Sequence, residues 1–278
     1  LVDTFAYDAF SSPAMQNMGD MMLVNNGQDV EAGVFYDEGI YVGYKYYETR
    51  YFDKMLEQGN AGDYDYSQVV QYPFGYGLSY TTFAWSDFTM SDMDDNGDIQ
   101  IQVTVTNTGD VTGRDVVQVY LNAPYTEYDR TNHIEKSSVS LVGFEKTGDL
   151  EPGASETLTI TVNQKDFISY DDVMAKTYIL EAGDYLLTAA PNAHAANNNF
   201  LAYAGRENDG LFGTPDPDFV GKWTYTYMDN NGVDNKTYSV SSTGTAITNQ
   251  FDHASYDELT PRDQYLTRQD WVGTFPTT

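Results

Sequence analysis

The sequence predicts a mainly β protein: an antiparallel β-sandwich that follows a partial α/β element and precedes an extended arm. Short alternations of apolar and polar residues recur between residues 82 and 200, and this period of two places one side of each strand in a core. Turn sequences such as Asn96-Gly97 and Ala182-Gly183-Asp184 separate these runs. The segment is about 120 residues long, a natural size for a sandwich of about seven strands.

Residues 1–80 predict a different kind of structure, an α/β element. Their apolar residues do not alternate as in strands. Between residues 39 and 56, Ile40, Tyr44, Tyr47 and Tyr51 recur at spacings of three or four, which places them on one face of a helix. We expect this element to be too small to fold alone, because a domain needs a core of its own.

Residues 81–200 predict the sandwich itself. In each expected strand, apolar residues alternate with the residues between them. The expected strands cover residues 99–105, 117–121, 158–162, 178–180 and 185–187.

Residues 201–278 predict an extended arm that packs on a neighbouring domain, because few of them are apolar. Trp223, Tyr225 and Tyr227 alternate with other residues before Asn231-Gly232, and apolar residues follow again. An Asn-Gly pair between two such runs is typical of a β-hairpin.

Charge and composition exclude several function classes. The chain of 278 residues has 14 Lys and Arg against 42 Asp and Glu, a net charge of −28. Proteins that bind nucleic acid or anionic membranes present clustered basic residues, so neither partner is expected. The chain has no cysteine, and no apolar run is long enough to span a membrane. The first ten residues lack the basic flank of a signal peptide, and the compartment stays unassigned.

Metal and nucleophile motifs are weak. Residues 92–97 read DMDDNG and open like a calcium-binding loop, but the twelfth position is Val103 instead of the bidentate Glu that such a loop requires. We therefore expect a turn there. His133, His194 and His253 are far apart in the sequence and are expected to be surface or loop residues. No metal site, catalytic triad or cofactor is predicted.

Glu38 has the most suggestive surroundings of the many carboxylates, because Tyr36, Tyr41 and Tyr44 flank it. Glu38 and Tyr41 are our candidates for substrate binding. The alternative for Glu38 is a structural salt bridge or a favourable interaction with a helix N-terminus. Sequence spacing identifies no pair of carboxylates for acid–base catalysis, so no residue is assigned a catalytic role.

Several segments between about residues 35 and 190 form a recognisable series. They are EGIYVGYKYY at 38–47, YPFGYGLSYT at 72–81, VTVTNTG at 103–109, GRDVVQVY at 113–120, LVGFEK at 141–146, LEPG at 150–153 and EAGDY at 181–185. In order and spacing, these segments together resemble glycoside hydrolase family 3, and in particular its β-glucosidases.

The resemblance implies that residues 1–80 are the C-terminal portion of an α/β sandwich domain. It also implies that residues 81–200 are a fibronectin type III-like, or immunoglobulin-like, domain. The parent would be a retaining enzyme that hydrolyses terminal β-D-glucosyl residues without a cofactor. Two alternatives stay open: a β-xylosidase or α-arabinofuranosidase parent, and a stand-alone carbohydrate-binding or structural sandwich.

The departures from the family are equally informative. In the family, the nucleophilic Asp lies in a β/α barrel domain, and the acid–base Glu lies upstream of the segment that resembles 38–47. Neither motif occurs here, so the chain alone is expected to be inactive. Residues 265–276, YLTRQDWVGTFP, resemble the segment that precedes the barrel in members with permuted domain order.

The expected partners are therefore the β/α barrel domain, or the remainder of the same enzyme, and a small or oligosaccharide glycoside substrate. The sequence does not begin with Met, and we expect it to come from the interior of a larger polypeptide. We also expect an exposed apolar surface along residues 1–80 and 201–278, where the missing domains would dock.

Overall fold

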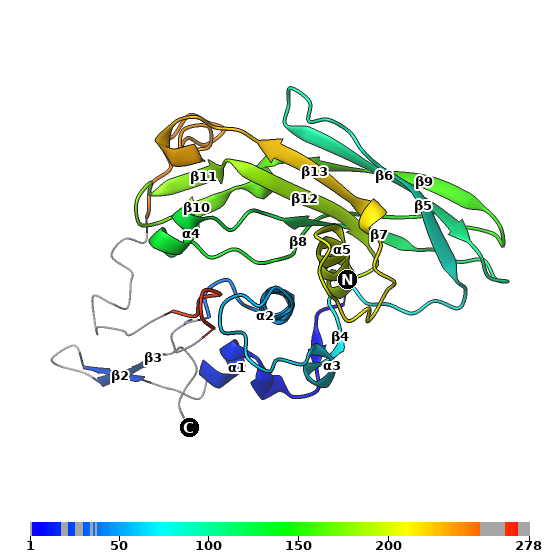
Figure 1. The fold of residues 1–278 in the computed structure, drawn as a ribbon, viewed down its shortest axis with the longest axis horizontal. Helices are drawn as coiled ribbons and strands as arrows, with labels where there is room; N and C mark the ends of the chain where they lie inside the picture. The colour runs from blue at the N-terminus through cyan, green and yellow to red at the C-terminus, as the bar shows by residue number, and fades with distance from the viewer. Residues whose placement is uncertain are drawn as a thin grey trace.

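The computed structural model describes residues 2–17, 22–25, 30–33, 36, 38–250 and 265–271. A β-sandwich of two antiparallel sheets forms its larger part (Figure 1). One sheet has three strands in the order β5-β6-β9, and the other has four in the order β13-β12-β7-β8. The strands are β5 (Phe83–Met90), β6 (Asp98–Asn107), β7 (Val116–Asn122), β8 (Ser140–Lys146), β9 (Ser155–Asn163), β12 (Gly183–Ala190) and β13 (Val220–Tyr225). The predicted mainly β class is confirmed.

Alternation along the strands forms the sandwich core, as the sequence predicts. Ile101 and Val103 of β6 are fully buried, whereas Gln100 and Gln102 between and beside them face solvent. The buried set packs against apolar residues of β7, β9 and β12 to form one cluster. Each fully buried aliphatic side chain stabilises the fold by about 1.5–3 kcal/mol relative to an exposed one.

Residues 91–97 form the β5–β6 turn, as expected, rather than a calcium loop. The Asp94 Oδ1 atom accepts hydrogen bonds from the backbone N–H groups of Asn96 (2.8 Å) and Asp98 (2.9 Å). Gly97 has φ +80°, a conformation that glycine adopts without steric cost. Val103 is buried in β6 and offers no ligand.

The predicted hairpin around Asn231-Gly232 is wrong. Strand β13 pairs with β12 instead, with Tyr185 opposite Trp223, and so becomes an edge strand of the sandwich. The later strand β14 (Val233–Asp234) pairs with β11 (Thr177–Glu181), which also pairs with β10 (Ser169–Asp171). The two segments therefore pair with the edges of β12 and β11 instead of with each other. Each pairing provides hydrogen-bond partners for backbone groups that would otherwise have none.

The N-terminal α/β element lies beside the four-stranded sheet (Figure 1). The predicted helix is confirmed as α2 (Tyr44–Met55). Helix α5 (Ala193–Tyr203) contacts both α2 and the sheet. The smaller elements are β1 (Phe5–Ala6), η1 (Ala9–Ser11), α1 (Pro13–Asn17), β2 (Met22–Asn25), β3 (Val30–Gly33), α3 (Tyr66–Val69), β4 (Val70–Tyr72), α4 (Glu127–Asn132), η2 (Gln164–Phe167), η3 (Pro217–Phe219) and η4 (Asn230–Gly232).

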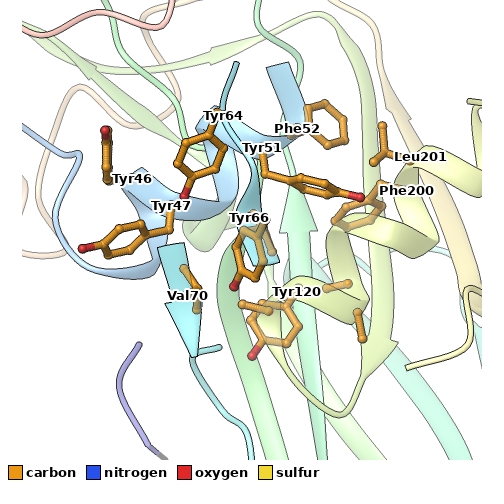
Figure 2. Close-up of a cluster of buried hydrophobic side chains, with 14 of the residues drawn as sticks. Tyr46, Tyr47, Tyr51, Phe52, Tyr64, Tyr66, Val70, Tyr120, Phe200 and Leu201 are labelled. Atoms are coloured by element: carbon orange, nitrogen blue, oxygen red, sulfur yellow. The ribbon is translucent and has the colours of Figure 1, made fainter. Parts of the chain in front are cut away.

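A second hydrophobic cluster joins this element to the sandwich. Figure 2 shows Tyr51 and Phe52 of α2 beside Phe200 of α5, with Tyr120 of β7 close to Tyr66. All five side chains are buried. The tyrosines that the sequence placed on one helical face contact different parts of the fold. Tyr51 donates to Asn198 of α5 at 2.7 Å, Tyr44 accepts from the Leu141 backbone N–H of β8 at 3.1 Å, and Tyr47 lies 2.9 Å from the Ser11 hydroxyl.

The YPFGYG segment at 72–77 forms a tight bend. Gly75 has φ +83°, and a Cβ atom there would collide with the side-chain amide of Gln118. The Gln118 amide in turn donates to the Gly75 carbonyl oxygen at 3.1 Å and to that of Pro191 at 2.7 Å. Only glycine permits this close approach of the bend to β7.

Apolar side chains are exposed in both segments where a docking surface is expected. In residues 1–80 they include Phe5, Tyr7 and Tyr80, and beyond residue 200 they include Met228. That these side chains form one continuous surface stays a prediction. None of the described helices is both long enough and apolar enough to cross a membrane.

Candidate functional site

Glu38 and Tyr41, the predicted substrate-binding residues, lie in the turn that precedes α2. The Tyr41 backbone N–H donates to the Glu38 carbonyl oxygen at 2.9 Å, which closes the turn. Both side chains are buried, and that of Tyr41 has no solvent exposure (0%). Gly39 and Ile40, between them, line a cavity of about 810 Å³.

The Tyr41 side chain is already engaged within the protein. Its hydroxyl donates to the Glu135 carboxylate, and its ring centre lies 5.0 Å from that of Trp271. Burial, together with the charge of Glu135, raises the pKa of the Tyr41 hydroxyl well above its usual value. The hydroxyl is therefore a neutral donor at all physiological pH values. A role for Glu38 and Tyr41 in substrate binding stays a prediction, and their burial favours the structural alternative.

Glu135 lines the same cavity, but both of its oxygens accept internal hydrogen bonds. The Oε1 atom accepts from the Thr267 hydroxyl at 2.5 Å, and Oε2 accepts from Tyr41 and from the Arg268 backbone N–H at 3.1 Å. Hydrogen bonds from three donors hold this carboxylate in one orientation. Glu135 therefore organises the site and is not a free acid or base.

Asp53 of α2 is the second carboxylate of this region. It accepts two hydrogen bonds from the Arg268 guanidinium, at 3.2 Å from Nε and also from a terminal nitrogen. The Trp271 indole N–H donates to the same carboxylate at 3.0 Å. Burial raises the pKa of Asp53, and the Arg268 charge opposes that shift. A guanidinium and a carboxylate joined by two hydrogen bonds form a strong and geometrically specific contact.

A buried histidine centre was missed at the sequence level. His194 was expected at the surface or in a loop, but it lies in α5 with 0% exposure. Its Nδ1 contacts the Glu48 carboxylate at 3.0 Å, and its Nε2 contacts that of Asp209 at 2.9 Å. Its ring stacks on Tyr66 with centres 3.7 Å apart. The prediction was wrong because the partners come from three separate segments of the chain.

Electrostatics decide the charge of His194. Burial alone would lower its pKa, but Glu48 and Asp209 more than offset this and raise the pKa to about 9. At neutral pH the ring is therefore an imidazolium that donates to both carboxylates. Neither ring nitrogen is left to accept a proton, so this centre joins α2, α5 and the loop after α5 rather than performing acid–base catalysis.

A third buried cluster surrounds Lys136, the residue that follows Glu135. The Lys136 ammonium donates to Asp129 at 2.9 Å, to the Glu181 carboxylate and to the Pro124 carbonyl oxygen at 3.1 Å. Burial raises the pKa of Asp129 to about 7. The described part of the chain contains no group of three or more His, Asp or Glu side chains arranged to hold a metal ion.

Comparison with known proteins shows which families and enzymes the chain is similar to. Residues 115–193, from the start of β7 to the first turn of α5, match the fibronectin type III-like domain family. A β-glucosidase from Ruminococcus albus is 36% identical over 204 residues, which is 72% of this chain and 18% of that protein. The chain is thus similar to β-glucosidases over most of its own length and contains a fibronectin type III-like domain. The expected resemblance is thus confirmed.

Other β-glucosidases show the same similarity. β-Glucosidase A from Butyrivibrio fibrisolvens is 38% identical over 168 residues, covering 55% of this chain and 18% of its own length. The solved β-glucosidase from Paenibacillus barengoltzii has a TM-score of 0.52 at 32% identity, over 69% of this chain and 18% of that chain. β-Glucosidase 3B from Thermotoga neapolitana, in complex with α-D-glucose, has a TM-score of 0.52 at 28% identity. The match covers 80% of this chain and 25% of that chain. The chain spans about a fifth of the length of these relatives.

Proposed function

We propose that this chain belongs to glycoside hydrolase family 3 and is a non-catalytic portion of a retaining enzyme that hydrolyses terminal β-D-glucosyl residues. The observation that carries the proposal is the 36% identity over 204 residues to a protein named β-glucosidase. The chain spans 18% of that relative, so the remaining length leaves room for a catalytic domain.

The state of the carboxylates supports a catalytic pair outside this chain. A retaining glycosidase needs two carboxyl groups about 5 Å apart, one to attack the sugar and one to move protons. Glu135 borders the large cavity but accepts hydrogen bonds on both oxygens, and Asp53 is paired with Arg268. Neither carboxylate is available to a substrate without breaking buried contacts.

We further propose that the chain braces the catalytic domain. The α/β portion (1–80), the fibronectin type III-like domain (81–200) and the arm (201–278) are the expected units, and a β/α barrel is the expected partner. Support comes from the second hydrophobic cluster, in which residues of all three units pack together, among them Tyr47, Tyr120 and Trp271. Such a rigid body would hold a neighbouring domain in a fixed orientation.

A direct test uses chromogenic aryl glycosides. The purified chain is assayed on β-D-glucoside, β-D-xyloside and α-L-arabinofuranoside substrates, first alone and then with a polypeptide that carries the barrel. We expect no turnover by the chain alone and hydrolysis of the glucoside after reconstitution. Preference for a xyloside or arabinofuranoside would assign the parent to that alternative. Turnover by the chain alone would refute the non-catalytic assignment.

A further inference from the structure

Residues 265–271, here called the latch, are anchored by their side chains. Leu266, Thr267, Arg268 and Trp271 are buried, whereas Tyr265 is exposed. The latch also forms its own turn, because the Trp271 backbone N–H donates to the Thr267 carbonyl oxygen at 2.9 Å. A short segment with buried anchors and an internal turn has the features of a preorganised peptide ligand.

The socket that receives the latch consists of Tyr41, Tyr46, Asp53, Tyr125 and Glu135. Its polar part is acidic and faces the basic side chain of the latch. Asp53 accepts from both Arg268 and Trp271, and Glu135 accepts from Thr267 and from the Arg268 backbone. The socket therefore binds the side chains of Thr267, Arg268 and Trp271 through hydrogen bonds of defined direction.

The apolar part of the socket is aromatic. The Trp271 ring centre lies 5.0 Å from that of Tyr41 and 5.8 Å from that of Tyr46. The Arg268 guanidinium carbon lies 4.7 Å from the centre of the Tyr125 ring. Tryptophan and arginine in desolvated pockets with aromatic walls are the features that dominate binding energy at protein interfaces.

The backbone also fits closely at one point. Gly59, in the loop after α2, has φ +59°, and a Cβ atom there would collide with the Arg268 carbonyl oxygen. The socket thus draws on α2 and its following loop on one side and on residues 125–136 on the other. Two separate parts of the fold must be in place before the latch can bind.

We propose that this socket is a peptide-recognition site for the pattern Thr-Arg-x-x-Trp. It holds the latch as a separable ligand, and so fixes the position of whatever polypeptide carries that pattern. This inference goes beyond the proposed function, because it assigns a specific recognition event to residues without any catalytic role. Recognition depends on the Asp53–Arg268 pair and on the Trp271 ring, not on chain continuity.

The test uses the full chain with a protease recognition sequence inserted within 251–264. The folded protein is cleaved there and analysed by native mass spectrometry and size exclusion. We expect the C-terminal piece to stay bound after cleavage. A fluorescent peptide of residues 264–273 should then exchange with it. Separation of the piece on cleavage would overturn the proposal.

Competition by variant peptides tests the specificity without altering the folded protein. A peptide with Arg268→Ala should compete at least about 100-fold more weakly, since it leaves Asp53 buried and unpaired. A Trp271→Ala peptide should also lose affinity. A peptide with Tyr265→Ala is the matched control and should stay within about threefold, because Tyr265 is exposed. Equal competition by all these peptides would show nonspecific association and refute the proposal.

Discussion

Replacing His194 with Gln is expected to change how stability depends on pH. In the folded protein Glu48 and Asp209 hold the His194 pKa at about 9 despite burial, against an ordinary value of 6.5. A tenfold change in proton affinity corresponds to about 1.4 kcal/mol. The two ion pairs therefore contribute about 3 kcal/mol to the free energy of unfolding when the ring is protonated in both states.

The sign follows from the direction of the shift. Because the folded pKa lies above the unfolded one, the contribution is complete below pH 6.5 and is lost as the pH rises through about 9. The other titratable groups that face the ring are Tyr51 and Tyr66, whose pKa values burial raises above 10. Both tyrosines stay neutral throughout this window and do not mask the effect.

The assay is urea unfolding followed by tryptophan fluorescence at pH 6 and pH 9.5. Between pH 6 and pH 9.5, the free energy of unfolding should fall by about 3 kcal/mol more in the wild-type protein than in His194→Gln. His133→Gln serves as the control, because His133 is exposed, and its pH dependence should match the wild type. If wild type and His194→Gln lose stability equally, His194 is not protonated in the folded state and the reasoning fails.

Three other substitutions and one control variant have expected outcomes in the same unfolding assay. Val103→Ala removes a fully buried side chain from β6 and should destabilise by about 1–3 kcal/mol; an unchanged midpoint would show that β6 is not in the core. Gly75→Ala should destabilise by more than about 1 kcal/mol, since it combines a positive φ with a collision against Gln118; wild-type stability would refute the tight bend. Arg268→Ala should cost about 3–5 kcal/mol by leaving Asp53 unpaired in the interior. Arg114→Ala, which breaks an exposed pair with Asp149, should leave the midpoint nearly unchanged, and equal losses for the two arginine variants would contradict the buried pairing.

The sandwich could be predicted because its information is local. In β6 each buried aliphatic residue is two positions from the next, so a short window of sequence reveals the strand and its buried face. The helix α2 was equally visible from its tyrosine spacing. The pairing of β13 with β12 could not be predicted in this way, because an unpaired strand edge exists only once the sheet has formed.

Helix α5 shows why tertiary contacts escaped the prediction. It contains Asn197, Asn198 and Asn199, and asparagine is a weak helix former. All three are buried and bond to distant groups, for example Asn197 to the Glu48 carbonyl oxygen at 2.9 Å and Asn199 to the Thr188 hydroxyl at 3.0 Å. These hydrogen bonds satisfy the asparagine amides and offset their low helix propensity. No local sequence pattern predicts them.

The candidate site was predictable only in part for the same reason. The 38–47 motif pointed to Glu38 and Tyr41, whose role in substrate binding stays a prediction, while Gly39 and Ile40 between them line the cavity of about 810 Å³. The groups that determine the chemistry there are Glu135 and Arg268, which lie more than ninety residues away in sequence. Contacts of that separation leave no periodic signature.

Helix α2 is the element through which the parts of this chain are joined. On one side its Glu48 meets His194 of α5, and on another its Asp53 meets Arg268 of the latch. Each contact is a buried ion pair, and breaking one partner leaves an uncompensated charge that costs several kcal/mol. Movement of α2 relative to either neighbour would therefore disrupt at least one buried pair. It follows that the α/β portion, the sandwich and the latch keep one relative orientation, which is the property that a brace for a catalytic domain requires.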